Sequence, residues 1–394
     1  MFLEKEGKLI YSYDGETVCI EAWGKDALRV RATKNRSFTG RDWALEAKDA
    51  HAGEVEIFED PSAKGGAFAN MYEGTDTSYG KITNGKLHAV IDSGSVITFY
   101  HEDGRVLLKE HFRRLRDEES MPLNIMGREY SNGVGDNFRI VARFVARKGE
   151  KIFGMGQYQQ HELDLKGCML ELAQRNSQVS VPFYLSSIGY GFLWNNPGVG
   201  QVMFANNGTE WVTESGKEID YLVIAGDTPA EIEENYMTLT GKPPMMPEYG
   251  MGFWQCKLRY WNQEQLLSVA RKYKELGVPL DVIVVDFFHW TKQGEFKFDP
   301  KYWPDVPGMC RELKEMGIQV VVSVWPTVDI YSENFEEMKE KGYLVRTEHG
   351  VPLTMLCGGN EVFFDATNPD ARTYVWEKIK KNYYDPVSYT HLTL

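Results

Sequence analysis

The stretch LDVIVVDFFHW at residues 280–290 decides the fold of the second half of the chain. Its aliphatic run Val282–Val285 has no polar interruption, which is typical of a parallel strand covered on both faces. Asp286 follows at once, and a carboxylate at the end of a buried strand is costly unless something binds it. The residue therefore indicates a hydroxyl or cationic partner, while an Asp that caps the following loop explains the sequence equally well.

Strand and helix patterns alternate around this stretch. The expected elements are a strand at Gly250–Gln255, a helix capped by Asn262 with Leu266, Val269, Tyr273 and Leu276 on one face, a helix at Gly308–Met316, a strand at Gln319–Trp325, a helix from Ser332 to Gly342, and a helix from Asn368-Pro369 to about Tyr383. Strand followed by helix, repeated, predicts a parallel sheet. The strand ends at Asp286 and Trp325 favour a (β/α)8 TIM barrel, although a doubly wound open sheet has the same rhythm. Only three or four of the eight barrel units fit, so an incomplete barrel is predicted.

The first part of the chain, to about Asp227, has a β pattern. Short alternating runs are separated by Asp14-Gly15, Asn84-Gly85 and Asp103-Gly104, which tolerate the positive φ of tight turns. Many short strands at this spacing predict a β-sandwich. The proline-rich segment Gly241–Pro247 is the expected linker, which predicts a sandwich domain at residues 1–241 and the first part of a barrel at residues 242–385.

Residues 386–394, PVSYTHLTL, follow neither a helix nor a strand pattern. They come where a turn into the next strand is due, and they resemble an artefact sequence attached to truncated reads. We expect this tail to be non-native, with a genuine frayed terminus as the alternative.

Composition limits the class of partner. The net charge is −13 and no basic stretch occurs, which argues against nucleic acid and anionic membranes as partners. No apolar run approaches the roughly 20 residues of a membrane helix, and the charged start lacks a signal peptide's apolar region. Five widely spaced cysteines suggest a reducing compartment, so a cytoplasmic enzyme is expected. The aromatic content of 13% fits large cores, or rings that stack on sugars.

Motifs for metals, dinucleotides and serine nucleophiles are missing from the sequence. It contains no C-x-x-C, no H-E-x-x-H and no G-x-S-x-G, and Gly154-Met155-Gly156 lacks the third glycine of a dinucleotide loop. We therefore expect neither metal nor cofactor, and chemistry that depends on carboxylates and aromatic rings. The candidates are Asp286, Trp325, for which a core position is the alternative, and the loop Cys256–Trp261, which is either an aromatic wall or a solvated loop.

Several separated motifs, in chain order, resemble glycoside hydrolase family 31 and within it the α-xylosidase branch. They are WQCK at Trp254–Lys257, DFFHW at Asp286–Trp290, FDP at Phe298–Pro300 with WPD at Trp303–Asp305, and FDATNP at Phe364–Pro369. Gly154–Gln160 and Gln174–Asn176, with Pro182–Tyr184, resemble the sandwich loop that these enzymes push into the active site. The resemblance extends to Asp385 and implies a galactose-mutarotase-like sandwich followed by the barrel.

The resemblance implies a retaining mechanism with an Asp nucleophile and an Asp acid/base, both of which are expected beyond Asp385. The 394-residue chain by itself is therefore expected to be inactive. Asp286 is expected to bind hydroxyls of the sugar that is cleaved, and Asn176, where relatives often carry Asp, to approach the same sugar. Phe287 is expected to crowd the C6 hydroxymethyl group of glucose, which xylose lacks. Trp254, His289 and Trp325 complete the expected substrate site.

Two alternatives remain open at this stage. An α-glucosidase or another α-hexosidase would need space beside Phe287. A non-catalytic carbohydrate-binding protein, or a mutarotase-like sandwich, would explain the first half but not the strand–helix units with polar strand ends. The expected partner is an α-xyloside or α-glucoside, and an oligomer of the full-length enzyme is left open.

Overall fold

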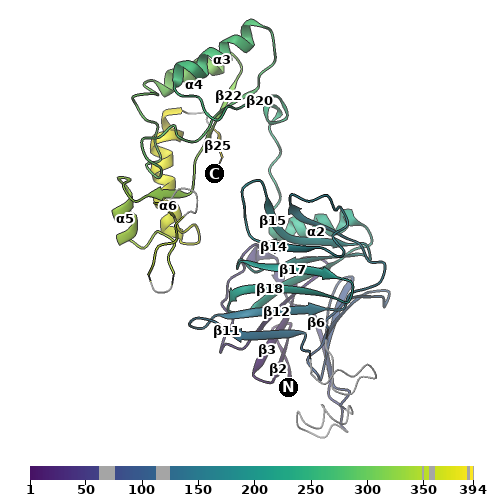
Figure 1. Ribbon diagram of the computed structural model, residues 1–394. Helices are drawn as coiled ribbons and strands as arrows, with labels where there is room; N and C mark the ends of the chain where they lie inside the picture. Colours follow the sequence, from purple (N-terminus) through teal and green to yellow (C-terminus); the bar gives the residue numbers. More distant parts are fainter. Residues whose placement is uncertain (62–75, 112–124, 348–349, 355–359, 388–390, 394) are drawn as a thin grey trace. The chain divides into compact units, whose positions relative to one another are not determined.

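The computed structural model describes residues 1–61, 76–111, 125–347, 350–354, 360–387 and 391–393. The chain divides into Met1–Pro243, here called the sandwich unit, and Pro244–Leu394, here called the α/β unit. Figure 1 shows strands almost throughout the first unit and alternating strands and helices in the second. Each unit is described by itself.

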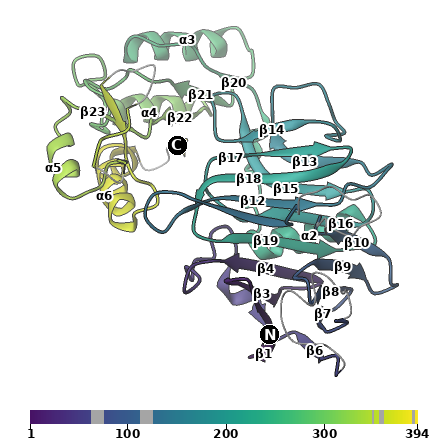
Figure 2. The ribbon, with the colours of Figure 1, turned by 60° about the horizontal axis from the view of Figure 1, so that its bottom comes forward.

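The described residues of the sandwich unit form three antiparallel sheets. In Figure 2 the strands β4, β19, β16 and β15 of the largest sheet lie in succession. This sheet runs in the order β1 (Phe2–Lys5), β2 (Lys8–Tyr13), β3 (Glu16–Trp23), β4 (Ala27–Thr33), β19 (Ile219–Ala225), β16 (Tyr190–Trp194), β15 (Val179–Ser186) and β13 (Ile152–Gln157), with β5 (Ala50–His51) paired to β3. The second sheet runs β10 (Val106–Lys109), β9 (Ile97–His101), β8 (Leu87–Asp92), β7 (Tyr79–Asn84) and β6 (Glu54–Phe58). The third runs β11 (Arg128–Asn132), β12 (Phe138–Phe144), β18 (Gly208–Gly216), β17 (Gly200–Ala205) and β14 (Met169–Leu172).

Tight turns join consecutive strands of these sheets as the glycine dipeptides predict. Asp14 and Gly15 have φ of 49° and 73° between β2 and β3, and positive φ at both central residues suits the twist of a two-residue hairpin. Gly85 and Gly104 also have positive φ, at 56° and 85°.

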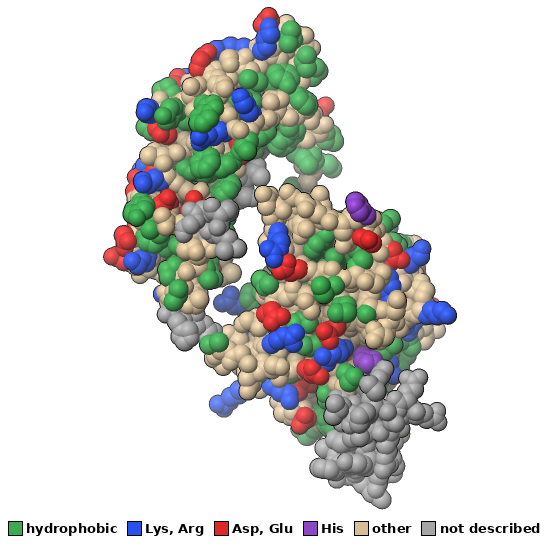
Figure 3. All heavy atoms as spheres, in the orientation of Figure 1, with side chains coloured by type: hydrophobic (Ala, Val, Ile, Leu, Met, Phe, Trp, Pro, Cys, Tyr) green, Lys and Arg blue, Asp and Glu red, His purple; other side chains and the backbone are tan. Residues whose placement is uncertain are grey.

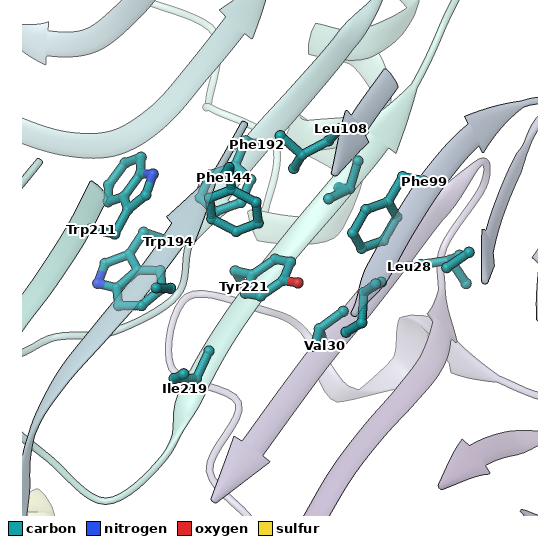
Figure 4. Packing of buried hydrophobic residues seen from close by; sticks show 14 of the residues in the cluster. Leu28, Val30, Phe99, Leu108, Phe144, Phe192, Trp194, Trp211, Ile219 and Tyr221 are labelled. Carbon is teal, nitrogen blue, oxygen red and sulfur yellow. The ribbon is translucent and has the colours of Figure 1, made fainter. Parts of the chain in front are cut away.

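Aromatic side chains from several strands form the core between the sheets. Figure 4 shows Trp194, Trp211, Phe144, Phe192 and Tyr221 grouped together, and the rings of Trp194 and Trp211 stack with centroids 5.6 Å apart. All five side chains are almost completely buried. This dense ring packing accounts for part of the aromatic content that the composition shows.

The helix α2 (Pro229–Thr240) covers the other face of the largest sheet. Thr228 caps it by accepting a hydrogen bond from Glu231 N, and Ile232 and Leu239 are buried in a cluster that also holds Leu222 and Ile224 of β19. Strand residues alternate between faces, so Tyr221 and Val223 pack into the main core instead.

The α/β unit contains a parallel sheet in the order β20 (Trp254–Gln255), β21 (Val282–Val285), β22 (Gln319–Ser323) and β25 (His391–Thr393). Its helices are α3 (Gln263–Glu275), α4 (Val306–Glu315), α5 (Phe335–Glu340) and α6 (Pro369–Ile379), which continues as a π-helical turn at Lys380–Tyr384. The antiparallel pair β23 (Thr327–Asp329) and β24 (Glu361–Phe363) is inserted between β22 and α6. Short 3-10 turns occupy Ala47–Asp49, Glu248–Met251 and Asp385–Val387.

Buried aliphatic residues of the parallel strands hold this unit together. Ile283 and Val285 of β21 share one cluster with Leu266 of α3, Leu313 of α4 and Val375 of α6. The cap predicted at Asn262 is confirmed, because its side chain accepts from Gln265 N at 2.9 Å. The helix predicted to begin at Asn368-Pro369 is also confirmed, and the Asn368 side chain caps it by accepting from Asp370 N at 2.9 Å.

Four local predictions are wrong. Gly250–Gln255 is mostly not a strand, since a 3-10 turn ends at Met251 and β20 has two residues. The helix α5 begins at Phe335 after Asn334 rather than being capped by Ser332. Leu276 is 62% exposed, and Leu267 and Ala270 are buried beside Leu266 in its place. His391–Thr393 pair with β22 as a strand, so the tail is not devoid of regular structure, while its non-native origin stays a prediction.

Candidate active site

Asp286 lies where β21 ends, beside the end of the neighbouring strand β20. Its Oδ1 atom accepts a hydrogen bond from Phe287 N at 2.8 Å, and the Cys256 thiol donates to Oδ2 at 3.7 Å. Cys256 follows Gln255, which pairs with Ile283 in the parallel register. Burial, and then the neighbouring Asp286 carboxylate, raise the pKa of this thiol, which keeps it protonated and able to donate. A carboxylate has about four acceptor positions, so Asp286 retains capacity for hydroxyl groups.

An aromatic pair flanks this carboxylate. The Phe287 ring stacks on the Trp325 ring with centroids 5.0 Å apart and planes 18° apart. Trp325 follows β22, and β21 and β22 pair in parallel through Val285 and Val322. Side chains at the carboxyl ends of neighbouring parallel strands meet in this way, as the sequence predicts. Trp325 is half-buried, so it is not simply a core residue.

His289 lies beneath the Asp286 loop rather than at its surface. It is 2% exposed, its Nδ1 is 3.0 Å from the Asp286 carbonyl oxygen, and its Nε2 is 2.8 Å from the Tyr383 hydroxyl. A carbonyl only accepts, so Nδ1 carries the proton and Nε2 accepts from Tyr383. Burial lowers the pKa of His289 to about 4. Both ring nitrogens are therefore used internally, and a contact of His289 with the substrate stays a prediction.

Trp254 is the first residue of β20 and is 44% exposed. Its indole N–H donates to the Gly250 carbonyl at 3.1 Å, which leaves only the faces of the ring available to a ligand. Its role in substrate binding stays a prediction.

Asn176 belongs to the sandwich unit. It is an exposed turn residue between Arg175 and Gln178, and Ser177 beside it has φ of 66°. The Gln174 side chain braces the turn by donating to Ser180 O at 2.9 Å and accepting from Ser180 N at 3.0 Å. The turn thus presents Asn176 outward, and its approach to a sugar stays a prediction.

Two family models match the chain. The model described as the glycosyl hydrolase 31 N-terminal galactose mutarotase-like domain matches residues 17–202, and the family 31 TIM-barrel domain matches residues 243–392. The uncharacterized family 31 glucosidase ORF2 of Pseudescherichia vulneris is 43% identical over 97% of this chain and 71% of its own length. The chain belongs to glycosyl hydrolase family 31. The predicted family, and the order of a mutarotase-like sandwich and a TIM-barrel domain, are confirmed.

Further relatives of this family 31 chain bear the name α-xylosidase. The α-xylosidase A of Aspergillus niger is 30% identical over 94% of this chain and 50% of its own length. A family 31 α-xylosidase from a soil metagenome, whose crystal structure is complexed with xylose, is 47% identical to this chain with a TM-score of 0.87. The match covers 98% of this chain and 56% of the length of that α-xylosidase. The chain thus spans about half the length of these two proteins.

The sequence pattern did not reveal the contacts around Arg259. Its guanidinium carbon lies 4.1 Å from the centroid of the Trp261 ring and 4.8 Å from that of the Phe288 ring. The aromatic residues of the loop Cys256–Trp261 were a possible signal, but the pairing with Phe288 comes from a different strand end.

Within the part of the chain that the structure describes, no group of three His, Cys, Asp or Glu side chains could hold a metal ion. Among those same residues, no helix is long and apolar enough to cross a membrane. The predicted cytoplasmic location stays a prediction.

Proposed function

We propose that this family 31 protein is a retaining glycoside hydrolase that acts on terminal α-linked xylose. The observation that carries the proposal is the half-buried Asp286 carboxylate beside the stacked rings of Phe287 and Trp325. Sugar hydroxyls donate to carboxylates, and flat rings contact the apolar faces of sugars.

Asp286 acts as a binding group in this proposal, not as the nucleophile. A retaining enzyme needs two carboxyl groups about 5–5.5 Å apart. Among the described residues, the Asp286 carboxylate accepts from the Phe287 N–H and the Cys256 thiol, which hold it as a hydrogen-bond acceptor. The catalytic pair is expected beyond Asp385, as the family resemblance implies.

Phe287 supports xylose over glucose as the preferred sugar. Its ring is held between Trp325, at 5.0 Å, and Phe288, at 4.2 Å, so it cannot easily swing away to admit a C6 hydroxymethyl group. Two relatives named above are α-xylosidases, whereas ORF2 is named a glucosidase. An α-glucosidase is therefore the second candidate.

Hydrolysis by the protein encoded by the whole reading frame tests the proposal. Aryl α-xyloside and aryl α-glucoside are compared in the wild type and in Phe287→Ala. We expect the wild type to prefer the xyloside. The ratio of kcat/KM for the xyloside to that for the glucoside should fall about tenfold in the variant, because one small substrate group in a pocket typically changes discrimination by at least that factor. A wild-type preference for the glucoside would reject the xylosidase assignment. As a control, the protein is inactivated by heat, and hydrolysis that persists afterwards would come from a contaminant.

A further control separates an enzyme from a binding protein. A sugar-binding protein would bind xylose but release no aryl group, even with the complete reading frame. Sequencing the DNA past codon 385 gives an independent check, because a W-x-D strand end there would supply the expected nucleophile.

A further inference from the structure

The segment that follows β4 in the sandwich unit exposes a tryptophan in an unusual backbone conformation. Trp43 has φ of 53° and is 42% exposed. Positive φ is uncommon for a bulky residue, and such strain persists only where the surrounding structure enforces it, often at functional sites. Leu45 N donates to Asp42 O at 2.9 Å, so Trp43 and Ala44 are the central residues of a tight turn. A glycine or an asparagine would form that turn with less strain, so the turn alone does not explain the tryptophan.

Core packing does not explain Trp43 either. Among the described residues, three clusters of buried hydrophobic side chains form, and Trp43 belongs to none of them. Leu45, two residues later, is 6% exposed and packs in the cluster that holds Ile232 and Leu239 of α2. The turn therefore has an inward side that contributes to the core and an outward side that presents the indole ring to solvent.

Buried polar side chains hold this turn in place. The Arg29 guanidinium donates to Asp42 Oδ1 at 2.7 Å and to Arg41 O at 2.9 Å. The Asn195 side chain donates to Asp42 O at 3.1 Å and accepts from Ala44 N at 3.2 Å. Arg29 belongs to β4 and Asn195 follows β16, so the largest sheet itself fixes the turn. A ring on a turn that is already ordered loses little conformational freedom when a ligand binds.

Arg41 and Trp43 also carry hydrogen-bond donors that the fold does not use. The Arg41 guanidinium carbon lies over the Trp43 ring, 5.4 Å from its centroid. Among the described residues, no group accepts from the Arg41 guanidinium or from the Trp43 indole N–H. The guanidinium of Arg31, in contrast, is paired with Glu21 at 2.7 Å. Exposed ring surface beside free N–H groups matches a sugar, which offers apolar C–H faces and hydroxyl oxygens that accept.

We propose that Trp43 and Arg41 form a carbohydrate-binding site on the sandwich unit, which takes pyranose units of a neutral polysaccharide. A pyranose stacks on the indole ring, and its hydroxyl oxygens accept from the guanidinium and the indole N–H. A protein partner is disfavoured, because the exposed neighbours Gly40, Arg41 and Ala44 provide no apolar interface core. The net charge of −13 disfavours nucleic acid and polyanionic sugars. A glycoside hydrolase held on a polymer in this way stays close to further substrate.

Affinity electrophoresis of the 394-residue chain tests the assignment. Native gels contain soluble xyloglucan, and the mobility as a function of xyloglucan concentration gives the dissociation constant. We expect xyloglucan to retard the wild type. Trp43→Ala should raise the dissociation constant roughly fivefold, because the stacking surface is lost. Arg41→Gln should raise it in the same direction, and Asp286→Ala should still be retarded, because Asp286 belongs to the α/β unit.

Two further variants act as controls. Trp43→Phe keeps an aromatic face and should bind xyloglucan more tightly than Trp43→Ala. Trp376→Ala is the matched control, because Trp376 is a 46% exposed tryptophan on α6, and its dissociation constant should equal that of the wild type. The midpoint of urea unfolding shows whether each variant is folded. If Trp43→Ala is unfolded, Arg41→Gln decides, because the Arg41 side chain is exposed and its dissociation constant must still rise.

Several results would overturn the inference. They are a wild type that xyloglucan does not retard, an unchanged dissociation constant in folded Trp43→Ala, and an equal rise in Trp376→Ala. Loss of retardation in Asp286→Ala would place the polymer at Asp286 instead. Stronger retardation by polygalacturonate than by xyloglucan would overturn the neutral chain. The proposed function is tested separately by hydrolysis of the aryl glycosides, so its failure and the failure of this inference are distinguishable.

Discussion

The two units differ in how completely their charged groups are paired and in where large apolar side chains are exposed. In the sandwich unit, buried charged side chains form ion pairs with one another, as Arg29 does with Asp220 and Arg128 does with Glu110 and Glu16. In the α/β unit, Asp286 and Arg259 keep unused hydrogen-bonding capacity at the strand ends. Large exposed apolar residues also gather early in this unit: Met245, Met246, Met251, Phe253, Trp254, Leu258 and Trp261. Figure 3 shows hydrophobic side chains on the face of this unit that is in view.

The difference separates stability from function. A buried charge network that is fully paired fixes one conformation and offers nothing to a ligand. Groups left partly unpaired at the ends of parallel strands cost some stability but can bind a substrate. We therefore expect substitutions in the sandwich network to change unfolding, and substitutions at the strand ends to change sugar binding.

The largest effect is expected from Arg29→Ala. Arg29 is completely buried and donates to Asp220 at 2.6 and 3.0 Å, and burial already raises the pKa of Asp220 to about 6. Removing the cation leaves a buried carboxylate without its charged partner, which should cost about 3–5 kcal/mol of unfolding free energy. Arg271→Ala, which breaks exposed pairs, should cost no more than about 1 kcal/mol. Urea unfolding measures both, and equal losses would contradict the contrast.

A second effect concerns acid stability through His289. Its folded pKa of about 4 lies below the ordinary value of 6.5, because burial disfavours the charged ring. The unfolded chain therefore binds a proton between these values while the folded chain does not, so this contribution is full above pH 6.5 and is lost as pH falls toward 4. The loss is about 3 kcal/mol at most. His289→Gln should flatten the dependence of unfolding free energy on pH in that window, and an unchanged slope would show that the ring is accessible to water.

The smallest effect on stability, and a clear one on binding, is expected from Asp286→Ala. Loss of charge-assisted hydrogen bonds should weaken xylose binding at least about tenfold, and should lower kcat/KM of an active enzyme by as much. The unfolding midpoint should change little, because Asp286 is only half-buried. Asp370→Ala, at an exposed position in the first turn of α6, is the control. Normal xylose binding by the Asp286 variant would reject the site assignment.

The fold followed from the sequence where local patterns decide it. The apolar run at Val282–Val285, the cap Asn262 and the helix start at Asn368-Pro369 are local signals, and all three were interpreted correctly. The apolar segment at Gly250–Gln255 misled because a short run with two glycines fits a turn as well as a strand. Leu276 follows the last residue of α3 and so falls outside the helical periodicity.

The site was predictable in outline only. Asp286 and Trp325 follow neighbouring parallel strands, as the order of strands in the sequence predicts, and Phe287 beside Asp286 stacks on Trp325. The internal hydrogen bond of His289 could not be predicted, because its partner Tyr383 lies 94 residues further along the chain. The stacking of Arg259 on Phe288 likewise joins two loops, and no local pattern reports such a contact.

The contact between His289 and Tyr383 also has a consequence for the order of events on the ribosome. Synthesis proceeds at about 5–20 residues per second, so Tyr383 is made roughly 5–20 seconds after its imidazole partner. During that interval the sandwich unit is already synthesised, whereas the imidazole has no hydroxyl to accept from. The Asp286 loop thus acquires its final support only when the residues that follow α6 have been synthesised, which makes the completion of this candidate site a late step for the nascent chain.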